Sequence, residues 1–350
     1  MRRTVLTVAI CALCSCAFAQ IENPAFTYVT EFETHPDYGP VLAIAADANG
    51  GIYFTQFSSP DPNMTACIYV EDPIGANGME NLIVVDDAAE DTDVPGGRGF
   101  HGLAVDDDGY IYLALEAGAN DTATVRRINP APDFGLDESW GGGVIWPLKR
   151  YNGIELLGNN VMALSTFSEV DFWAQDDPNA DLLHTVGGGE TYQRDLAFNP
   201  STGDIYISKN RDVSGAPFSS ASILRGNGPD DLGSYEAIET DFIPQGGIGG
   251  QYGAHQQKIE YDALNDFIII GDYSTDPPTM AFFRPTNTSQ PVAAIDASDS
   301  PNGPFEYPTD AVAHADSDGD TFIYITTWTE NRILVYQMGD FTGVWGWELH

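Results

Sequence analysis

The sequence has very few basic residues. It contains 14 Lys and Arg against 52 Asp and Glu, which gives a formal net charge of −38 over 350 residues. Proteins bind nucleic acids and anionic lipid surfaces through clustered Lys and Arg, so this composition argues against both as partners. The charge favours solubility and cationic or metal ligands, and a solvated acidic surface with no specific use is the simpler interpretation.

Long apolar and helical stretches are also missing. No segment after residue 20 is apolar over the roughly 20 residues that a membrane-spanning helix needs. Sustained helical periodicity is absent as well, whereas the 36 Gly and 22 Pro suit a turn-rich chain. The nucleophile elbow G-x-S-x-G, the zinc motif H-E-x-x-H, the P-loop and a C-x-x-C pair do not occur in the mature chain.

Residues 1–19 have the pattern of a secretory signal peptide. Arg2 and Arg3 precede a short apolar stretch, and Ala17-Phe18-Ala19 forms a small-residue cleavage site. The segment contains no acid, so cleavage leaves 14 − 2 = 12 basic residues and a mature charge of 12 − 52 = −40. We therefore expect a secreted or periplasmic protein, and a lipoprotein attached at Cys16 is the alternative.

Three of the four cysteines leave with that segment. Cys67 then stands alone, so the mature chain cannot form an internal disulfide. No His or Lys is adjacent to it in sequence, and we interpret it as a buried strand residue rather than a reactive thiol.

A hairpin pattern recurs through the chain: an apolar strand, a turn of Asp, Asn or Gly, and a strand of the Ile-Tyr type. The copies are 42–54 (LAIAADANGGIYF), 101–113, a degenerate one at 154–163, 195–207, 257–269 and 311–327. Their turns lie roughly 45 to 62 residues apart, and a repeat of about 40–50 residues with four strands is typical of a propeller blade. The prediction is an all-β, six-bladed β-propeller with about four antiparallel strands per blade.

The other strands and the domain limits follow from the same pattern. Third strands are expected at 67–70, 125–128, 170–173, 222–225, 280–283 and 333–336, and fourth strands at 82–85, 144–146, 182–185, 237–242 and 292–295. The segment 26–29 should close the ring as the outer strand of the last blade. Residues 20–340 would then form a single domain, and 341–350 a tail or edge strand. The segments 228–250 and 296–308 look like rim loops.

Polar residues precede the inner strand of several blades. In a propeller these positions converge at one mouth of the central channel, so they are candidates for a ligand pocket. They are Tyr38, His101, Asn152, Arg194, His255, Gln257 and Asp310. The alternatives without a functional role are an ordinary Asn-Gly turn for Asn152 and a structural or merely pocket-lining role for His101.

The last hairpin resembles an NHL repeat. Asn331-Arg332-Ile333 matches the end of that repeat, and Asp107-Asp108-Gly109-Tyr110-Ile111-Tyr112 matches its middle. The arrangement is also similar to the six-bladed regucalcin/gluconolactonase superfamily over roughly residues 38–338. In its lactonase members a Glu, one or two Asn and an Asp hold a divalent metal at the channel mouth. Asp310 resembles that Asp and Asn152 one Asn, while Tyr38 stands where the Glu is expected.

Three functions remain open at this stage. The first is a binding or protein-interaction module that uses the channel mouth and rim loops, with a small molecule or a protein as its ligand. The second is a metal-dependent lactonase or esterase, in which Asp310 and His101 would be catalytic and metal-binding and calcium would be the expected metal; His101 could instead bind a transition metal or act as a general base. The third is a quinone-dependent sugar dehydrogenase. Whether the protein is an enzyme stays undecided, and we expect a monomer.

Two Asp-rich turns also suggest calcium. The turns 106–109 and 316–320 lack the Gly and Glu that a helical calcium loop needs at its sixth and twelfth positions. Asp-Gly hairpin turns explain both sequences without a metal.

Overall fold

The structure is a computed structural model. It describes residues 26–56, 65–75, 81–87, 99–116, 125–141, 144–145, 151–177, 182–187, 193–209, 219–244, 258–272 and 277–339. The predicted signal peptide, the predicted tail at 341–350, and the candidate ligand residues His255 and Gln257 lie outside these ranges.

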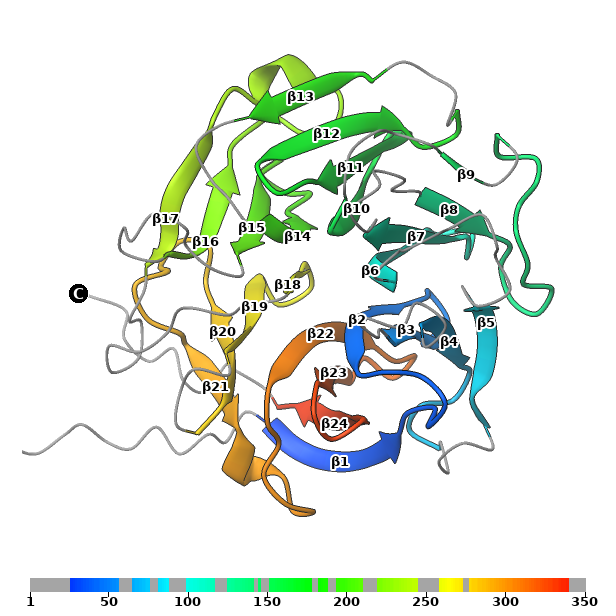
Figure 1. Cartoon of the computed structure of the whole chain (residues 1–350). Helices are drawn as coiled ribbons and strands as arrows, with labels where there is room; N and C mark the ends of the chain where they lie inside the picture. Colours follow the sequence, from blue (N-terminus) through cyan, green and yellow to red (C-terminus); the bar gives the residue numbers. More distant parts are fainter. Residues whose placement is uncertain are drawn as a thin grey trace, which may run out of the picture.

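The described residues form six four-stranded antiparallel sheets around a central axis (Figure 1). Blade 1 contains β2 (Val41–Ala46), β3 (Ile52–Gln56), β4 (Ala66–Val70) and β5 (Ile83–Asp87). Blade 2 contains β6 (Gly99–Val105), β7 (Ile111–Glu116), β8 (Val125–Ile128) and β9 (Val144–Ile145). Blade 3 contains β10 (Gly153–Gly158), β11 (Val161–Ser165), β12 (Glu169–Ala174) and β13 (His184–Gly187).

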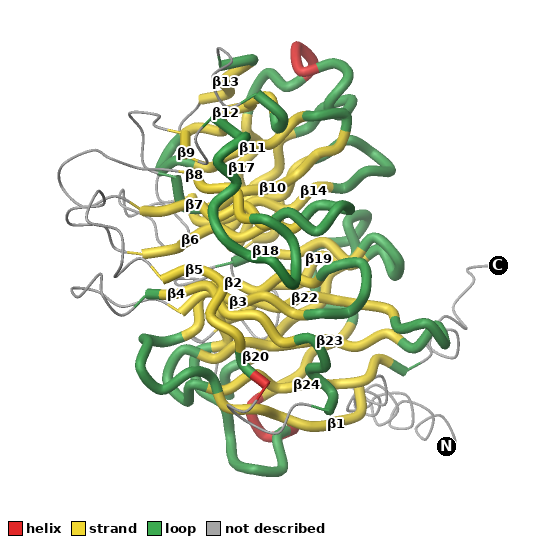
Figure 2. The backbone as a smooth tube through the Cα atoms, turned by 90° about the vertical axis from the view of Figure 1, so that its right-hand side faces the viewer, coloured by secondary structure: helices red, strands yellow, loops and turns green. Residues whose placement is uncertain are grey.

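The second half of the ring repeats this order. Blade 4 contains β14 (Gln193–Phe198), β15 (Ile205–Lys209), β16 (Ser219–Leu224) and β17 (Ile238–Pro244). Blade 5 contains β18 (Ile259–Asp262), β19 (Phe267–Asp272), β20 (Thr279–Phe283) and β21 (Ala293–Asp296). Blade 6 contains β22 (Pro308–Ala315), β23 (Thr321–Thr327), β24 (Arg332–Met338) and β1 (Phe26–Glu33). The predicted six-bladed propeller is confirmed, with the strands running across the disc in the side view (Figure 2).

The ring closes through its two ends. Strand β1 pairs antiparallel with β24, from Phe26 opposite Met338 to Glu33 opposite Arg332. This confirms the predicted closure and extends it from four residues to eight. The outer edge of blade 6 is therefore built from both ends of the domain, and opening the ring would expose apolar side chains of β24 that are buried.

The first hairpin of three blades turns in the same way. The carboxylate of Asp47 accepts hydrogen bonds from the backbone N–H groups of Asn49 and Gly51, at 2.8 and 2.9 Å. Asp106 and Asp316 do the same in blades 2 and 6. The carboxylates thus serve to shape the turns, and each turn has a glycine in the left-handed region, such as Gly109 with φ +84°.

Two of the predictions about the loops need revision. Within 228–250, a short 3₁₀ turn η4 (Leu232–Ser234) precedes β17, and within 296–308 a second one, η5 (Ala297–Asp299), follows β21. The second turn has a capping box between Asp296 and Asp299, a local pattern that the loop prediction did not consider.

The core lies between neighbouring blades, as is expected of a propeller. One buried cluster joins blades 1 and 2 through residues such as Tyr53, Phe100 and Leu113. Cys67 belongs to this cluster; it is free and fully buried, which confirms its interpretation as a strand residue. In the described part of the chain, no helix is long and apolar enough to cross a membrane.

Candidate functional site

The inner strands of four blades begin with a β-bulge. The pairing of β6 with β7 skips His101, that of β14 with β15 skips Arg194, and that of β22 with β23 skips Thr309 and Asp310. In blade 1 the skipped residue is Leu42. Bulges re-aim side chains and occur often beside functional sites. The predicted mouth residues His101, Arg194 and Asp310 therefore lie inside the first part of their strands and not before them. The strand pairing continues on the far side of each bulge.

Asp310 connects the last blade to the first. Its Oδ2 accepts a hydrogen bond from the N–H of Ile44 on β2 at 2.9 Å, and its Oδ1 accepts one from the N–H of Ala311 at 2.9 Å. Beside it, the Thr309 hydroxyl donates to the carbonyl of Val41 at 3.1 Å. The Asp310 carboxylate is buried, and both of its oxygens already bind backbone N–H groups.

A buried ion pair connects blades 3, 4 and 5. Lys258 immediately precedes β18, and its Nζ lies 3.2 Å from Oδ1 of Asp195 on β14. The same Nζ donates to the carbonyl of Asn152, the residue before β10, at 3.3 Å. The Lys258 side chain is only 2 % exposed. We call Asn152, Gln193, Asp195, Lys258 and Asp310 the mouth cluster, since all five stand at the starts of inner strands.

Two members of the mouth cluster have unused hydrogen-bonding groups. Asn152 donates through Nδ2 to the carbonyl of Gln193 at 3.0 Å, but its Oδ1 has no partner in the described structure. The Gln193 side chain has none for either its Oε1 or its Nε2. Both residues are fully buried. An unpaired buried polar atom costs about 1–3 kcal/mol, so these groups are candidates for contact with a ligand.

The pKa values of the carboxyl groups in the mouth cluster are raised. Burial raises the pKa of Asp195 to about 6, although the Lys258 ammonium and backbone hydrogen bonds oppose the rise. Burial also raises the pKa of Asp310 well above its usual range, and the negative charge of Asp195 adds to this.

Below the mouth, two glutamates face a cavity. Glu155 on β10 and Glu260 on β18 line a space of about 190 Å³ whose other walls are apolar residues such as Ile44, Leu103 and Val312. Burial and the charge of Asp195 raise the pKa of Glu155 to about 8. Burial raises the pKa of Glu260 well above its usual range, and the charges of Glu155 and Asp310 add to this. Glu155 therefore holds its proton at neutral pH, and the pKa of its neighbour Glu260 is shifted in the same direction.

The structure places the remaining predicted residues in different surroundings. His101 is buried at its bulge in blade 2, and Asn152 belongs to the mouth cluster. Arg194 is half-buried, with its guanidinium 5.8 Å from the ring centre of Phe167. Tyr38 is half-buried and packs against His35. The proposed pair of His101 and Asp310 lies on β6 and β22, the inner strands on either side of β2. Their joint role as metal ligands or catalytic groups stays a prediction.

A metal centre is not formed by the described residues alone. Among them, no group of three or more His, Cys, Asp and Glu side chains is arranged to hold an ion. The backbone contacts of Asp310 use one site on each carboxylate oxygen, so a metal would have to share these oxygens with the N–H groups of Ile44 and Ala311.

Sequence reasoning missed Lys258, Asp195 and the two channel glutamates. It selected Arg194 and Gln257, each one residue before the residue that forms the buried ion pair. Side chains alternate in a strand and bulges break that alternation, so an error of one residue changes the face. Charged residues inside otherwise apolar inner strands, as in Ile154-Glu155-Leu156 and Ile259-Glu260-Tyr261, were the available signal.

Comparisons with known proteins identify no family. No protein-family profile matches the chain, and no curated protein matches it significantly. A solved structure described as "Crystal structure of Nidogen/Laminin Complex" is similar, with 14 % identity and a TM-score of 0.49 over 85 % of this chain and 89 % of that chain. The fold assignment therefore rests on the strand pairing described above.

Proposed function

We propose that this protein is a secreted binding module that holds a polar ligand at the mouth of its channel. The observation that carries the proposal is the pair of fully buried side chains with unused hydrogen-bonding groups, Asn152 and Gln193, beside the Lys258–Asp195 ion pair. A ligand that satisfied these groups would recover the free energy that their burial costs. A β-propeller is suited to this role, because its blades bring distant segments together without needing a catalytic group.

The chemistry of the mouth cluster indicates the type of ligand. Asn152 offers an acceptor, Gln193 an acceptor and a donor, and Lys258 has three N–H donors of which two are used. Hydroxyl and amide groups match this mixture, whether they belong to a small molecule or to a protein loop. The strong negative charge of the chain disfavours anionic ligands. Tyr38 and Arg194, both half-buried, would add contacts around such a ligand.

A thermal-shift experiment on residues 20–350 tests the proposal. The probes are D-glucose, myo-inositol, ethanolamine, N-acetylglycinamide and, as an anion, citrate. A ligand present at about 100 times its Kd stabilises the native state by about 2.7 kcal/mol, which raises Tm by roughly 4 °C for a domain of this length. We expect a hydroxyl- or amide-bearing probe to raise Tm of the wild type and citrate to have no effect.

Two variants separate the mouth cluster from general effects. Gln193→Leu removes the two unused groups of that side chain, Oε1 and Nε2, and should abolish the shift in Tm. Gln337→Leu makes the same change at a half-buried position on β24 and should leave the shift intact. An equal shift in Gln193→Leu and in the wild type would rule out the mouth cluster as the binding site.

A metal-dependent lactonase or esterase related to the regucalcin/gluconolactonase superfamily is the second candidate. The carboxyl side chains of the channel and its mouth favour it, because they interact electrostatically with one another: Glu155, Asp195, Glu260 and Asp310. A divalent cation would neutralise their negative charge, and calcium is the metal that we expect. The test is hydrolysis of a δ-lactone and of p-nitrophenyl acetate with added calcium, zinc or manganese. This function requires turnover that a chelator, Asp310→Asn and His101→Ala each abolish, and no turnover with any of the three metals would eliminate it.

A further inference from the structure

A second concavity lies away from the mouth cluster, at the junction of blades 5 and 6. It has a volume of about 390 Å³, within the roughly 300–1,000 Å³ range of ligand pockets. Its walls come from the turn before β20, from η5 and from the segment that leads into β22. That segment ends at Tyr307, three positions before Asp310, and leads into the start of the inner strand β22, so the pocket lies on the same face as the channel mouth.

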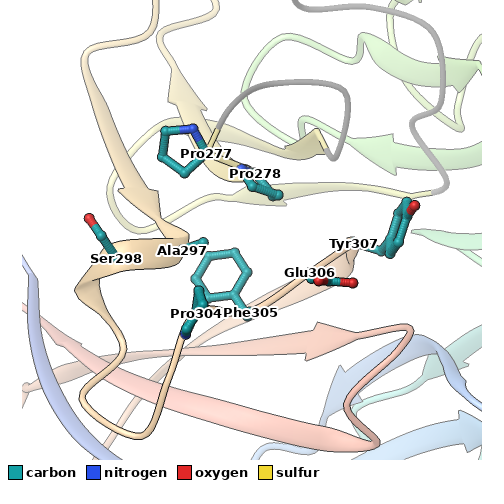
Figure 3. A pocket seen from close by; sticks show the side chains of 8 residues that line it. All are labelled: Pro277, Pro278, Ala297, Ser298, Pro304, Phe305, Glu306 and Tyr307. Atoms are coloured by element: carbon teal, nitrogen blue, oxygen red, sulfur yellow. The ribbon is translucent and has the colours of Figure 1, made fainter.

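The lining of this pocket is largely apolar and includes three prolines. Pro277, Pro278 and Pro304 form its sides, and the ring of Phe305 lies in its middle (Figure 3). Phe305 is fully buried and belongs to the same core cluster as Ala297, so it is anchored in the domain. Proline fixes its own backbone angle, and a pocket built in this way loses little conformational entropy when it is filled.

Tyr307 forms one end of the pocket in an unusual conformation. Its φ of +49° lies in the left-handed region, which is a genuine outlier for an aromatic residue. The N–H of Trp328 donates to the carbonyl of Tyr307 at 3.0 Å and holds this segment in place. The side chain nevertheless remains 38 % exposed. Strained residues persist where the surroundings enforce them, and they cluster at ligand-binding sites.

Acidic groups lie on two sides of the pocket. Glu306 is exposed beside Tyr307 (Figure 3), and Asp296 and Asp299 cap the η5 turn. The guanidinium of Arg332, which is buried behind this wall, binds Glu31 at 3.0 Å and donates to the carbonyls of Gly303 and Pro304. It therefore holds the wall of the pocket in place and is itself neutralised. The pocket combines an apolar, aromatic interior with a negative rim.

We propose that this pocket docks an extended, arginine-bearing segment of a partner protein. An arginine side chain has an apolar stem, which suits the proline walls, and a planar cation, which stacks on a tyrosine ring and binds a carboxylate. Proline or another apolar residue next to the arginine would fill the remaining space. A second copy of this chain is a poor occupant, because two chains of charge −38 repel each other.

Fluorescence anisotropy with a labelled (Pro-Arg)₃ amide peptide tests the proposal. The comparison peptide carries citrulline, the neutral isostere, in place of arginine. The salt concentration is about 0.15 M, at which the Debye length of about 8 Å screens distant carboxylates. We expect saturable binding of the arginine peptide, and binding of the citrulline peptide that is weaker by roughly tenfold or more.

Three variants locate the binding site. Tyr307→Asn removes the ring but suits the left-handed backbone, and it should weaken binding by roughly tenfold. Glu306→Gln should weaken it by roughly three- to tenfold, because one partner of the guanidinium is lost. Glu236→Gln also removes an exposed charge, from the segment that precedes β17 in blade 4, and it should change binding by less than about twofold. Circular dichroism and Tm confirm that each variant is folded.

Three results would overturn the proposal. One is the absence of saturable binding to the wild type. Another is an equal loss of affinity in Glu306→Gln and Glu236→Gln, which would mean that the peptide responds only to overall charge. The third is a dimer in light scattering that Tyr307→Asn dissociates, because a second copy would then be the occupant. Gln193→Leu should leave peptide binding unchanged, so failure at this pocket and failure at the mouth cluster are distinguishable.

Discussion

Replacing Glu155 with Gln should stabilise the protein at alkaline pH and leave its stability unchanged at acidic pH. Glu155 ionises with an ordinary pKa of 4.5 in the unfolded chain, whereas burial and the charge of Asp195 raise its pKa to about 8 in the channel. Between these pH values the unfolded chain releases a proton that the native protein retains. The free energy of unfolding therefore falls as the pH rises from about 4.5 to about 8.

The size of this effect follows from the change in pKa. A pKa raised from 4.5 to about 8 corresponds to roughly 5 kcal/mol of lost stability above pH 8, at about 1.4 kcal/mol per pKa unit. Asp195, Glu260 and Asp310 ionise in the same channel and share part of that loss, with Lys258 as the opposing charge. For Glu155→Gln we therefore expect a gain of about 1–3 kcal/mol at pH 9 and a gain of less than about 0.5 kcal/mol at pH 5.

The geometry favours a simple comparison. The N–H of Phe198 donates to Oε1 of Glu155 at 3.3 Å, and the amide oxygen of Gln can accept the same bond. The variant therefore keeps this hydrogen bond and removes only the ionisable group. Urea unfolding followed by circular dichroism at pH 5, 7 and 9 gives the three free energies for the wild type, Glu155→Gln and the exposed control Glu236→Gln. Parallel stability curves for the wild type and Glu155→Gln across this range would refute the reasoning.

Three further predictions concern the ion pair, a close contact and the lone thiol. Lys258→Met should destabilise the protein by about 3–5 kcal/mol, since it leaves the Asp195 carboxylate buried and unpaired, and adding Asp195→Asn should restore much of that loss in chemical denaturation. Gly153→Ala should cost about 1–3 kcal/mol, because its Cβ would overlap Oδ1 of Asp195 and lie 2.6 Å from the Cα of Asp195. Gly187→Ala, whose Cβ would be 3.5 Å from its nearest neighbour, is the matched control, and a similar Tm for both variants would contradict this reading. Cys67 is buried, and burial raises the pKa of its thiol. In the protein that comprises residues 20–350, a thiol reagent should therefore label Cys67 only after unfolding. Rapid labelling of the native protein would show that blade 1 opens.

The fold was predictable from sequence because its signals are local. Alternating apolar and aromatic residues mark the strands, and Asp and Gly mark the turns, so third strands such as 125–128 were placed to the residue. Ring closure by residues 26–29 followed from the need to pair an exposed edge, and β1 pairs with β24 there. The two short 3₁₀ turns were missed, because a single turn has no periodicity for a pattern to reveal.

The sequence by itself determined the propeller, the burial of Cys67 and the stretch of each blade in which polar residues should gather. Only the tertiary structure decided which of those residues meet. The ion pair between Lys258 and Asp195, which are 63 positions apart, depends on how blades 4 and 5 pack, and the bulges at His101 and Arg194 shift side chains by one residue. A strand pattern repeats every two residues and carries no information on a one-residue shift or on contacts between blades, so these details arise only when the ring is closed.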